Sequence, residues 1–229
     1  MIKKITALKI QKRNPNRVNV YLDDEYAFGL AKIVAVWLKI GQELDEVKIA
    51  TLKAEDEAEV VYQKALHFLS FRPRSEGEVR QRLLKQEYDE AVIDAAIVRL
   101  KEKHFLGDQQ FASVWIENRS TFRPRSQRML AMELRKKDVS EEVIASALEE
   151  APEDDVLAYQ AAERYAHRLK GLDWLSFRKK LLGFLGRRGF FYGTAAPIVR
   201  QIWAEFYSED DEPLNENMEE ELDNELDTE

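Results

Sequence analysis

The pentapeptide Phe-Arg-Pro-Arg-Ser occurs twice, at residues 71–75 and 122–126, and its arginines have the most specific spacing in the chain. Each proline restricts the arginine before it to an extended or turn conformation, and the serine after it can cap a helix. A guanidinium group suits bidentate binding of carboxylate or phosphate. One interpretation is therefore a row of partner-facing side chains, Arg72, Arg74, Arg123 and Arg125. The other is local packing of the arginine stems with ion pairs to Glu76 or Glu78, and the sequence leaves both open.

A third basic site lies at residues 187–190, Arg-Arg-Gly-Phe. Phe190 aligns with apolar or aromatic positions of the earlier copies, so we expect it in the core. Arg187 and Arg188 are expected on the surface and complete the set of candidate partner-binding residues.

The sequence contains no constellation typical of an enzyme. Its three histidines, His67, His104 and His167, are scattered, and it has no phosphate loop, dinucleotide-binding glycine motif or nucleophile elbow. Cysteine is absent, which excludes disulfides and thiolate metal sites and suits a reducing cytoplasm. No apolar run approaches the ~20 residues that cross a bilayer. We therefore expect a cytoplasmic, non-enzymatic protein with no catalytic residue, cofactor or metal.

The charge of the chain is divided between a body and a tail. Residues 208–229 hold 12 acidic residues and no Lys or Arg, so the remaining chain has 35 basic against 31 acidic residues, a net charge of +4. Like-charge blocks of low hydrophobicity do not fold alone, and we predict a disordered acidic tail. The tail can either restrain the basic surface of its own chain or act only as a solubilising segment.

An internal repeat organises the region after the first 54 residues. At an offset of 51, the window 71–100 matches 122–151 at 11 of 30 positions, and a second shift of 51 keeps the apolar skeleton. A fixed period of this length indicates stacked copies of one unit, which predicts an elongated monomer. We expect a β-containing extension at 1–54, three-helix repeats at 55–107, 108–153 and 154–207, and the tail at 208–229.

Capping residues divide each repeat into three short helices. Ser75 with Glu78 forms a capping box, and Asp89, Ser126 and Ser140 precede further helices. Gly189 is expected to end a helix, and Pro197 is expected in a first helical turn. In the extension, period-two alternation around residues 18–22 predicts a small β-meander, and residues 31–53 are expected to be helical with a break at Gly41.

At these residues the sequence resembles the RecX family of bacterial RecA regulators. The resemblance rests on residues 71–75 with Leu83, the linker 105–112, residues 185–190 and the N-terminal stretch 5–44. It implies tandem three-helix repeats in a curved molecule that docks in the groove of the RecA–DNA filament. The sequence departs from the family at Glu87 and Asp138, where members usually carry glycine, and at Gly107, which replaces an acid.

Two functions follow from these observations. The first is a regulator of the RecA filament that inhibits or modulates ATP hydrolysis and strand exchange in recombination, DNA repair and the SOS response. The alternative is a helix-turn-helix-like regulator that acts directly on DNA, since three-helix units resemble such domains. With a body of only +4, binding to single- or double-stranded DNA is expected to be weak and salt-sensitive.

Overall fold

The structure is a computed structural model that describes residues 1–206. By its internal contacts the chain divides into two units, Met1–Trp115 with Glu133–Glu149, and Ile116–Met132 with the chain from Glu150 onward. The predicted acidic tail, 208–229, lies outside the described residues. No helix within residues 1–206 combines the length and the apolar character that crossing a bilayer requires.

A four-stranded antiparallel sheet forms the N-terminal part of the first unit. Its strands are β1 (Lys3–Ile10), β2 (Arg17–Leu22), β3 (Glu25–Ala31) and β4 (Glu43–Leu44), in the order β3-β2-β1-β4. The predicted meander is thus confirmed. The two-residue β4 pairs with Lys3 and Lys4 and was missed, because so short a strand leaves no alternation in the sequence.

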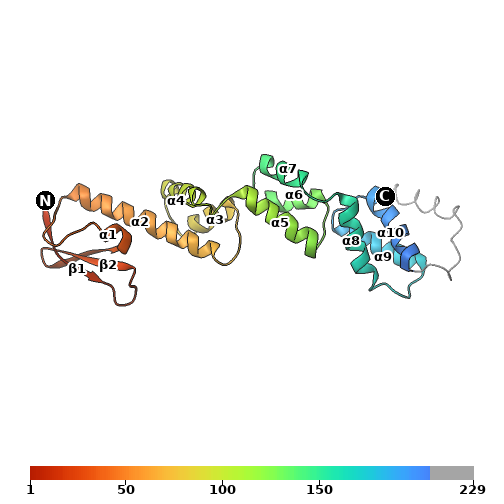
Figure 1. Cartoon of the computed structure of the whole chain (residues 1–229), viewed down its shortest axis with the longest axis horizontal. Coiled ribbons are helices and arrows are strands. Elements are labelled where there is room, and N and C mark those ends of the chain that lie inside the picture. Colours follow the sequence, from red (N-terminus) through yellow and green to blue (C-terminus); the bar gives the residue numbers. More distant parts are fainter. Residues whose placement is uncertain (207–229) are drawn as a thin grey trace. The chain divides into compact units, whose positions relative to one another are not determined.

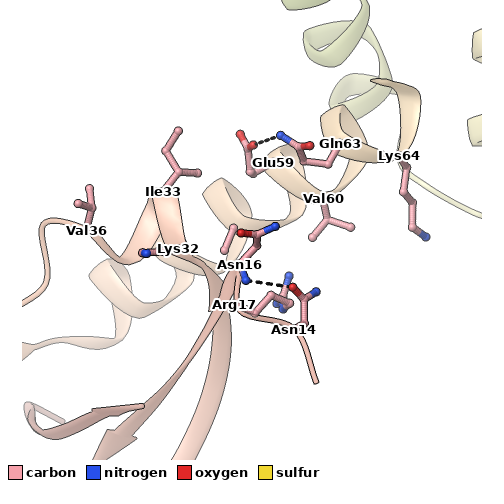
Figure 2. Close-up of a pocket in the computed structure, with 11 residues that line it drawn as sticks. Asn14, Asn16, Arg17, Lys32, Ile33, Val36, Glu59, Val60, Gln63 and Lys64 are labelled. Carbon is pink, nitrogen blue, oxygen red and sulfur yellow. Dashed lines mark hydrogen bonds between the residues drawn. The ribbon is translucent and has the colours of Figure 1, made fainter. Parts of the chain in front are cut away.

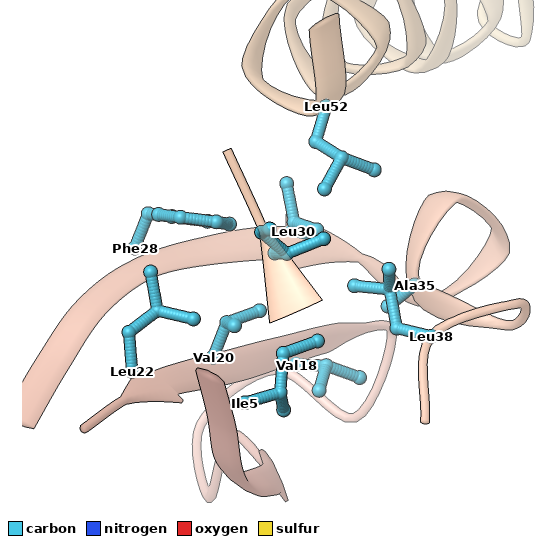
Figure 3. Packing of buried hydrophobic residues seen from close by; sticks show 10 residues of the cluster. Ile5, Val18, Val20, Leu22, Phe28, Leu30, Ala35, Leu38 and Leu52 are labelled. Atoms are coloured by element: carbon cyan, nitrogen blue, oxygen red, sulfur yellow. The ribbon is translucent and has the colours of Figure 1, made fainter. Parts of the chain in front are cut away.

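One face of this sheet forms a hydrophobic core with the first helices (Figure 3). Alternation along β2 turns Val18, Val20 and Leu22 to that face, and Leu52 covers it from helix α2 (Glu46–Leu69). The prediction of helix over residues 31–53 is wrong for most of its first half. Helix α1 is only Lys32–Ala35, because the chain must turn at Gly41, where φ is +88°, to add β4 to the sheet.

Helices then follow in groups of three, which confirms a mainly helical fold of tandem three-helix repeats (Figure 1). Repeat 1 consists of α2, α3 (Glu76–Leu84) and α4 (Glu90–Glu102). Repeat 2 consists of α5 (Asp108–Phe122), α6 (Gln127–Arg135) and α7 (Glu141–Glu149). Repeat 3 consists of α8 (Asp154–Ala166), α9 (Trp174–Arg187) and α10 (Tyr192–Phe206).

The predicted helix caps are present. Ser75 and Glu78 form a reciprocal capping box at the start of α3, and the Asp89 carboxylate accepts from the backbone N–H of Ala91. The hydroxyls of Ser126 and Ser140 accept from backbone N–H groups three residues later, at 3.3 and 3.4 Å. The second helix of every repeat therefore begins at a polar capping side chain. This residue is serine in repeats 1 and 2 and Asp173 in repeat 3.

The second helix of each repeat is followed by a left-handed residue at an equivalent position. Glu87, Asp138 and Gly189 lie 51 residues apart and have φ values of +62°, +58° and +93°. Glutamate and aspartate thus adopt the conformation for which glycine is favoured. The expectation for Pro197 is wrong, since it is the sixth residue of α10 and lies beyond the first helical turn. A proline there removes the N–H that would bond to the carbonyl of Gly193.

Candidate functional site

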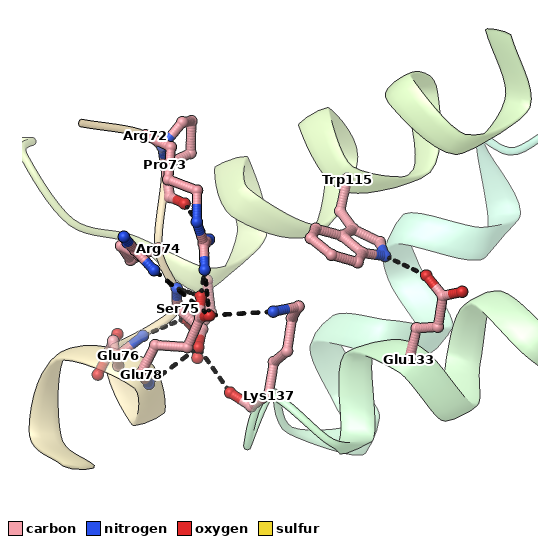
Figure 4. A network of polar contacts seen from close by, with 10 residues as sticks. Arg72, Pro73, Arg74, Ser75, Glu76, Glu78, Trp115, Glu133 and Lys137 are labelled. Atoms are coloured by element: carbon pink, nitrogen blue, oxygen red, sulfur yellow. Dashed lines mark hydrogen bonds and ion pairs between the residues drawn. The ribbon is translucent and has the colours of Figure 1, made fainter. Parts of the chain in front are cut away.

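The first Phe-Arg-Pro-Arg-Ser segment joins repeat 1 to repeat 2 within the first unit (Figure 4). The Ser75 hydroxyl donates to the backbone carbonyl of Lys137 at 2.6 Å, and the Glu76 N–H donates to the Asp108 carboxylate at 2.8 Å. The start of α3 is thus bound both to the first residue of α5 and to the turn that follows α6. We call this contact, from Arg72 to Glu78 with Asp108, Lys137 and Asp138, the first junction.

Three cations surround Glu78 at the first junction. Arg72 donates to both Glu78 carboxylate oxygens at 2.7 and 3.2 Å, and Lys137 Nζ donates to one of them at 3.0 Å. Arg74 Nη1 lies 3.9 Å from Glu78, and the Arg74 guanidinium stacks 4.0 Å from the Phe68 ring centroid. Burial alone would raise the pKa of Glu78, but hydrogen bonds and charges from Arg72 and Lys137 outweigh it and lower this pKa to about 2.

The second Phe-Arg-Pro-Arg-Ser segment makes the equivalent contact to repeat 3 within the second unit. The Ser126 N–H donates to the Arg188 carbonyl at 3.1 Å, and the Gln127 N–H donates to the Asp154 carboxylate at 2.7 Å. The Arg188 guanidinium also donates to the Pro124 carbonyl at 2.8 Å. We call this contact, from Arg123 to Met129 with Asp154, Arg188 and Gly189, the second junction.

The second junction has no counterpart of Glu78, because Met129 stands at the equivalent helix position. Burial, together with the charges of Arg125, Arg123 and Arg164, lowers the pKa of Arg188. Among residues 1–206, no carboxylate forms an ion pair with Arg123, Arg164 or Arg188. Within the described residues, Arg123 and Arg188 of the second junction therefore lack a carboxylate partner of the kind that Glu78 provides at the first junction.

The six candidate arginines thus divide into two groups. Arg72 and Arg74 pair with Glu78, which is the local alternative that the sequence had left open. Arg123 and Arg187 are exposed, whereas Arg125 and Arg188 are half-buried. Phe190 is buried as predicted, at 4% exposure. The structure thus brings together the arginines of the second segment with Arg188, while Arg72 and Arg74 belong to a separate cluster.

A larger basic region escaped the sequence analysis. Residues 164–200 contain nine basic residues and one acid, Asp173, for a net charge of +8. On α9 the side chains of Lys179, Lys180 and Arg187 are exposed, while Phe177 and Leu181 are buried. Counting charges in short windows along the chain would have found this region. The net charge of +4 for the chain without its acidic tail hides it, because acidic stretches elsewhere offset its positive charge.

A cavity of about 780 Å³ lies in the first unit between the sheet and α2 (Figure 2). Two of its polar residues are already engaged: Arg17 pairs with Asp56 at 2.8 Å, and Glu59 pairs with Arg99 at 2.6 Å. Ile33 and Val36 line its apolar side and are more than half exposed. The lining offers contacts for binding and holds no nucleophile beside a base.

Metal-binding geometry does not occur within residues 1–206, where no three His, Asp or Glu side chains converge. His67 packs edge-on against Phe71 and His167 against Phe206, with ring centroids 4.9 and 4.8 Å apart. These two histidines therefore have packing partners.

Comparison with known proteins agrees with this architecture. Residues 3–45 match the regulatory protein RecX N-terminal domain, and residues 62–100 and 108–148 match the first and second three-helix domains of RecX. The regulatory protein RecX of Bacillus subtilis is 33% identical over 202 residues, which cover 86% of this chain and 76% of that protein. The chain belongs to the RecX family.

Further RecX proteins extend the match. The regulatory protein RecX of Halalkalibacterium halodurans is 30% identical over 227 residues, covering 95% of this chain and 81% of that protein. A crystal structure of regulatory protein RecX has a TM-score of 0.68 at 26% identity and covers 86% of this chain and 98% of that chain. The two three-helix domain matches contain Arg72, Arg74, Arg123 and Arg125, so both Phe-Arg-Pro-Arg-Ser segments lie within regions typical of RecX. A regulatory role follows from the family.

Proposed function

We propose that this chain binds the RecA–DNA filament and restrains ATP hydrolysis and strand exchange by RecA. The observation that carries the proposal is membership of the RecX family, whose matched relatives are called regulatory proteins. The sequence resemblance supplies RecA as the partner. Because RecA acts on the chromosome, this function places the protein in the cytoplasm.

The second junction is the part of the proposed contact surface with the clearest chemistry. Arg123 is exposed, and Arg188 is surrounded by the positive charges of Arg123, Arg125 and Arg164. Guanidinium groups bind carboxylates and phosphates, and a RecA–DNA filament presents both. The first junction is unsuited to this role, because Glu78 already occupies Arg72 and Arg74.

RecA ATPase activity on single-stranded DNA, measured while this protein is titrated in, tests the proposal. We expect a saturable decrease in ATP hydrolysis at constant RecA and DNA. No effect on ATPase activity or on strand exchange at a large molar excess of the protein would contradict it.

Two double variants separate binding from folding. Arg123→Ala with Arg187→Ala removes exposed charges and is expected to weaken inhibition about tenfold, while each change shifts stability within about 0.5 kcal/mol. Arg72→Ala with Arg74→Ala should instead lower stability, because Glu78 loses two partners. Arg13→Ala, in an exposed turn of the sheet, is the control for charge removal and should leave inhibition unchanged.

The second candidate function, direct regulation of DNA, is favoured by the +8 charge of residues 164–200. Such a charge binds phosphates without reading sequence. Gel shift at physiological salt, with and without RecA, distinguishes the two functions. Binding that requires RecA supports the filament regulator, whereas sequence-specific binding in its absence supports the direct DNA regulator.

A further inference from the structure

The described chain ends inside its most basic region. Phe206, the last residue of α10, places its ring 4.8 Å from the His167 ring and 5.7 Å from Lys170 Nζ. Both partners belong to the turn after α8, in the segment 164–200 that has nine basic residues and one acid. Phe206, after which the acidic segment follows in the sequence, therefore lies beside Lys170.

Helix α9 presents an open cationic face in the same repeat. Lys179, Lys180 and Arg187 are exposed on it. Gly183 and Gly186 lie between them and are also exposed, and a Cβ added to Gly186 would meet nothing within 4 Å. Because glycine has no side chain, another backbone can approach the helix closely there. We call Lys179, Lys180, Gly183, Gly186 and Arg187 the α9 basic face.

The residues that follow Phe206 have the complementary charge. Residues 207–229 number 23, and they include 12 carboxylates and no Lys or Arg. Extended, they span up to about 75 Å, whereas the 14 residues of α9 span about 21 Å. The segment can therefore reach the α9 basic face from its attachment beside Lys170.

We propose that residues 208–229 bind the α9 basic face of their own chain and must be displaced before another polyanion can occupy it. Tethering holds the segment at a millimolar-scale local concentration, so that individually weak ion pairs suffice. The contact depends on ionic strength, because the screening length is about 8 Å at physiological salt and about 3 Å at 1 M. This inference does not require RecA to be the partner of the protein.

A spin label at the end of the chain tests the contact in the full-length protein. The sequence has no cysteine, so Thr228→Cys provides a single attachment site. At 50 mM salt we expect the label to broaden the amide NMR signals of residues 179–187, with at least a twofold loss of intensity that 1 M salt reverses. Unchanged intensities at 50 mM salt would overturn the proposal.

Charge variants test where the segment binds. Lys179→Glu with Lys180→Glu should abolish the broadening at Arg187, since it places like charge on the α9 basic face. Lys12→Glu with Lys48→Glu changes the net charge equally at exposed sites of the first unit and should leave the broadening intact. Persistence of the broadening in the first variant, or its loss in the control, contradicts binding at α9.

A mixed sample identifies which copy supplies the segment. Spin-labelled chains without ¹⁵N are combined with ¹⁵N-labelled chains without the spin label. We expect no broadening in this sample, because the segment binds its own chain. Broadening as strong as in the singly prepared protein would overturn the intramolecular proposal and assign the contact to a second copy.

Discussion

The first and second junctions join equivalent segments of successive repeats, but different residues balance their charge. At the first, Glu78 accepts hydrogen bonds from Arg72 and Lys137. At the second, Met129 stands at the equivalent position, and Arg188 lies among arginines. A repeated motif can thus keep one structural role while only one of its copies carries the acid that pairs with its arginines.

The two junctions also differ in which side supplies the glycine. At the first it is Gly77 on α3, where an added Cβ would overlap the Asp138 side chain and lie 2.9 Å from the Lys137 carbonyl oxygen. At the second it is Gly189, where an added Cβ would overlap Met129 and lie 2.5 Å from the Ser126 hydroxyl. Each junction therefore needs one residue without a side chain, and either repeat can provide it.

Gly189→Ala is expected to have the largest effect of the changes considered. The added Cβ meets both Ser126 and Met129, and φ of +93° is strained for alanine. We expect a loss of about 3 kcal/mol in the free energy of unfolding, measured with urea. Gly186→Ala, in an open helical position of the same repeat, should be neutral or stabilising by up to about 1 kcal/mol. Equal losses in both variants would show that the contact to Ser126 is unimportant.

Gly77→Ala should destabilise the first junction by about 2 kcal/mol, because its Cβ overlaps the Asp138 side chain. Asp138→Gly removes that side chain and also relieves a left-handed aspartate. The double variant should therefore recover about half of the loss, since the Lys137 carbonyl still opposes the new methyl group. A double-mutant cycle with additive effects would reject the proposed contact.

Glu78→Gln should lower the free energy of unfolding by about 1 kcal/mol at pH 7, because three cations lose their common carboxylate. The pKa of Glu78 is about 2 when folded, against an ordinary value of 4.5. Between these values protonation favours the unfolded state, so the contribution is fully present above pH 4.5 and is lost as pH falls toward 2. Urea unfolding at several pH values should show the difference between the two proteins shrinking over that range.

Met129→Glu transfers the acid of the first junction to the second. It creates the Ser-x-x-Glu capping box with Ser126 and should stabilise α6 by about 0.5–1 kcal/mol. The new carboxylate lies where it can pair with Arg188, so inhibition of RecA should weaken about tenfold despite the gain in stability. Unchanged inhibition would remove the second junction from the proposed contact surface.

Local sequence patterns predicted the elements of this fold better than their contacts. Serine caps and the alternating residues of β2 are signals that span only a few residues, and the period of 51 is a repetition. All three can therefore be recognised in the sequence alone. The pairing of Glu78 with Lys137 joins residues 59 apart and depends on how one repeat packs on the next. The two-residue β4 was missed because it leaves no alternation in the sequence, and Pro197 was misplaced because a local rule assigned it to a first helical turn.

The reach of the junction contacts in sequence sets an order of events during synthesis. The Ser75 hydroxyl bonds to the carbonyl of Lys137, which is 62 residues further along the chain. At roughly 5–20 residues per second, the ribosome needs about 3–12 s to deliver that partner. Until then the start of α3 lacks its contact with Lys137. It also lacks its contact with Asp108 until the 32 residues that follow Glu76 have been synthesised. The nascent first and second repeats thus each stay incomplete at one end until the repeat that follows has emerged.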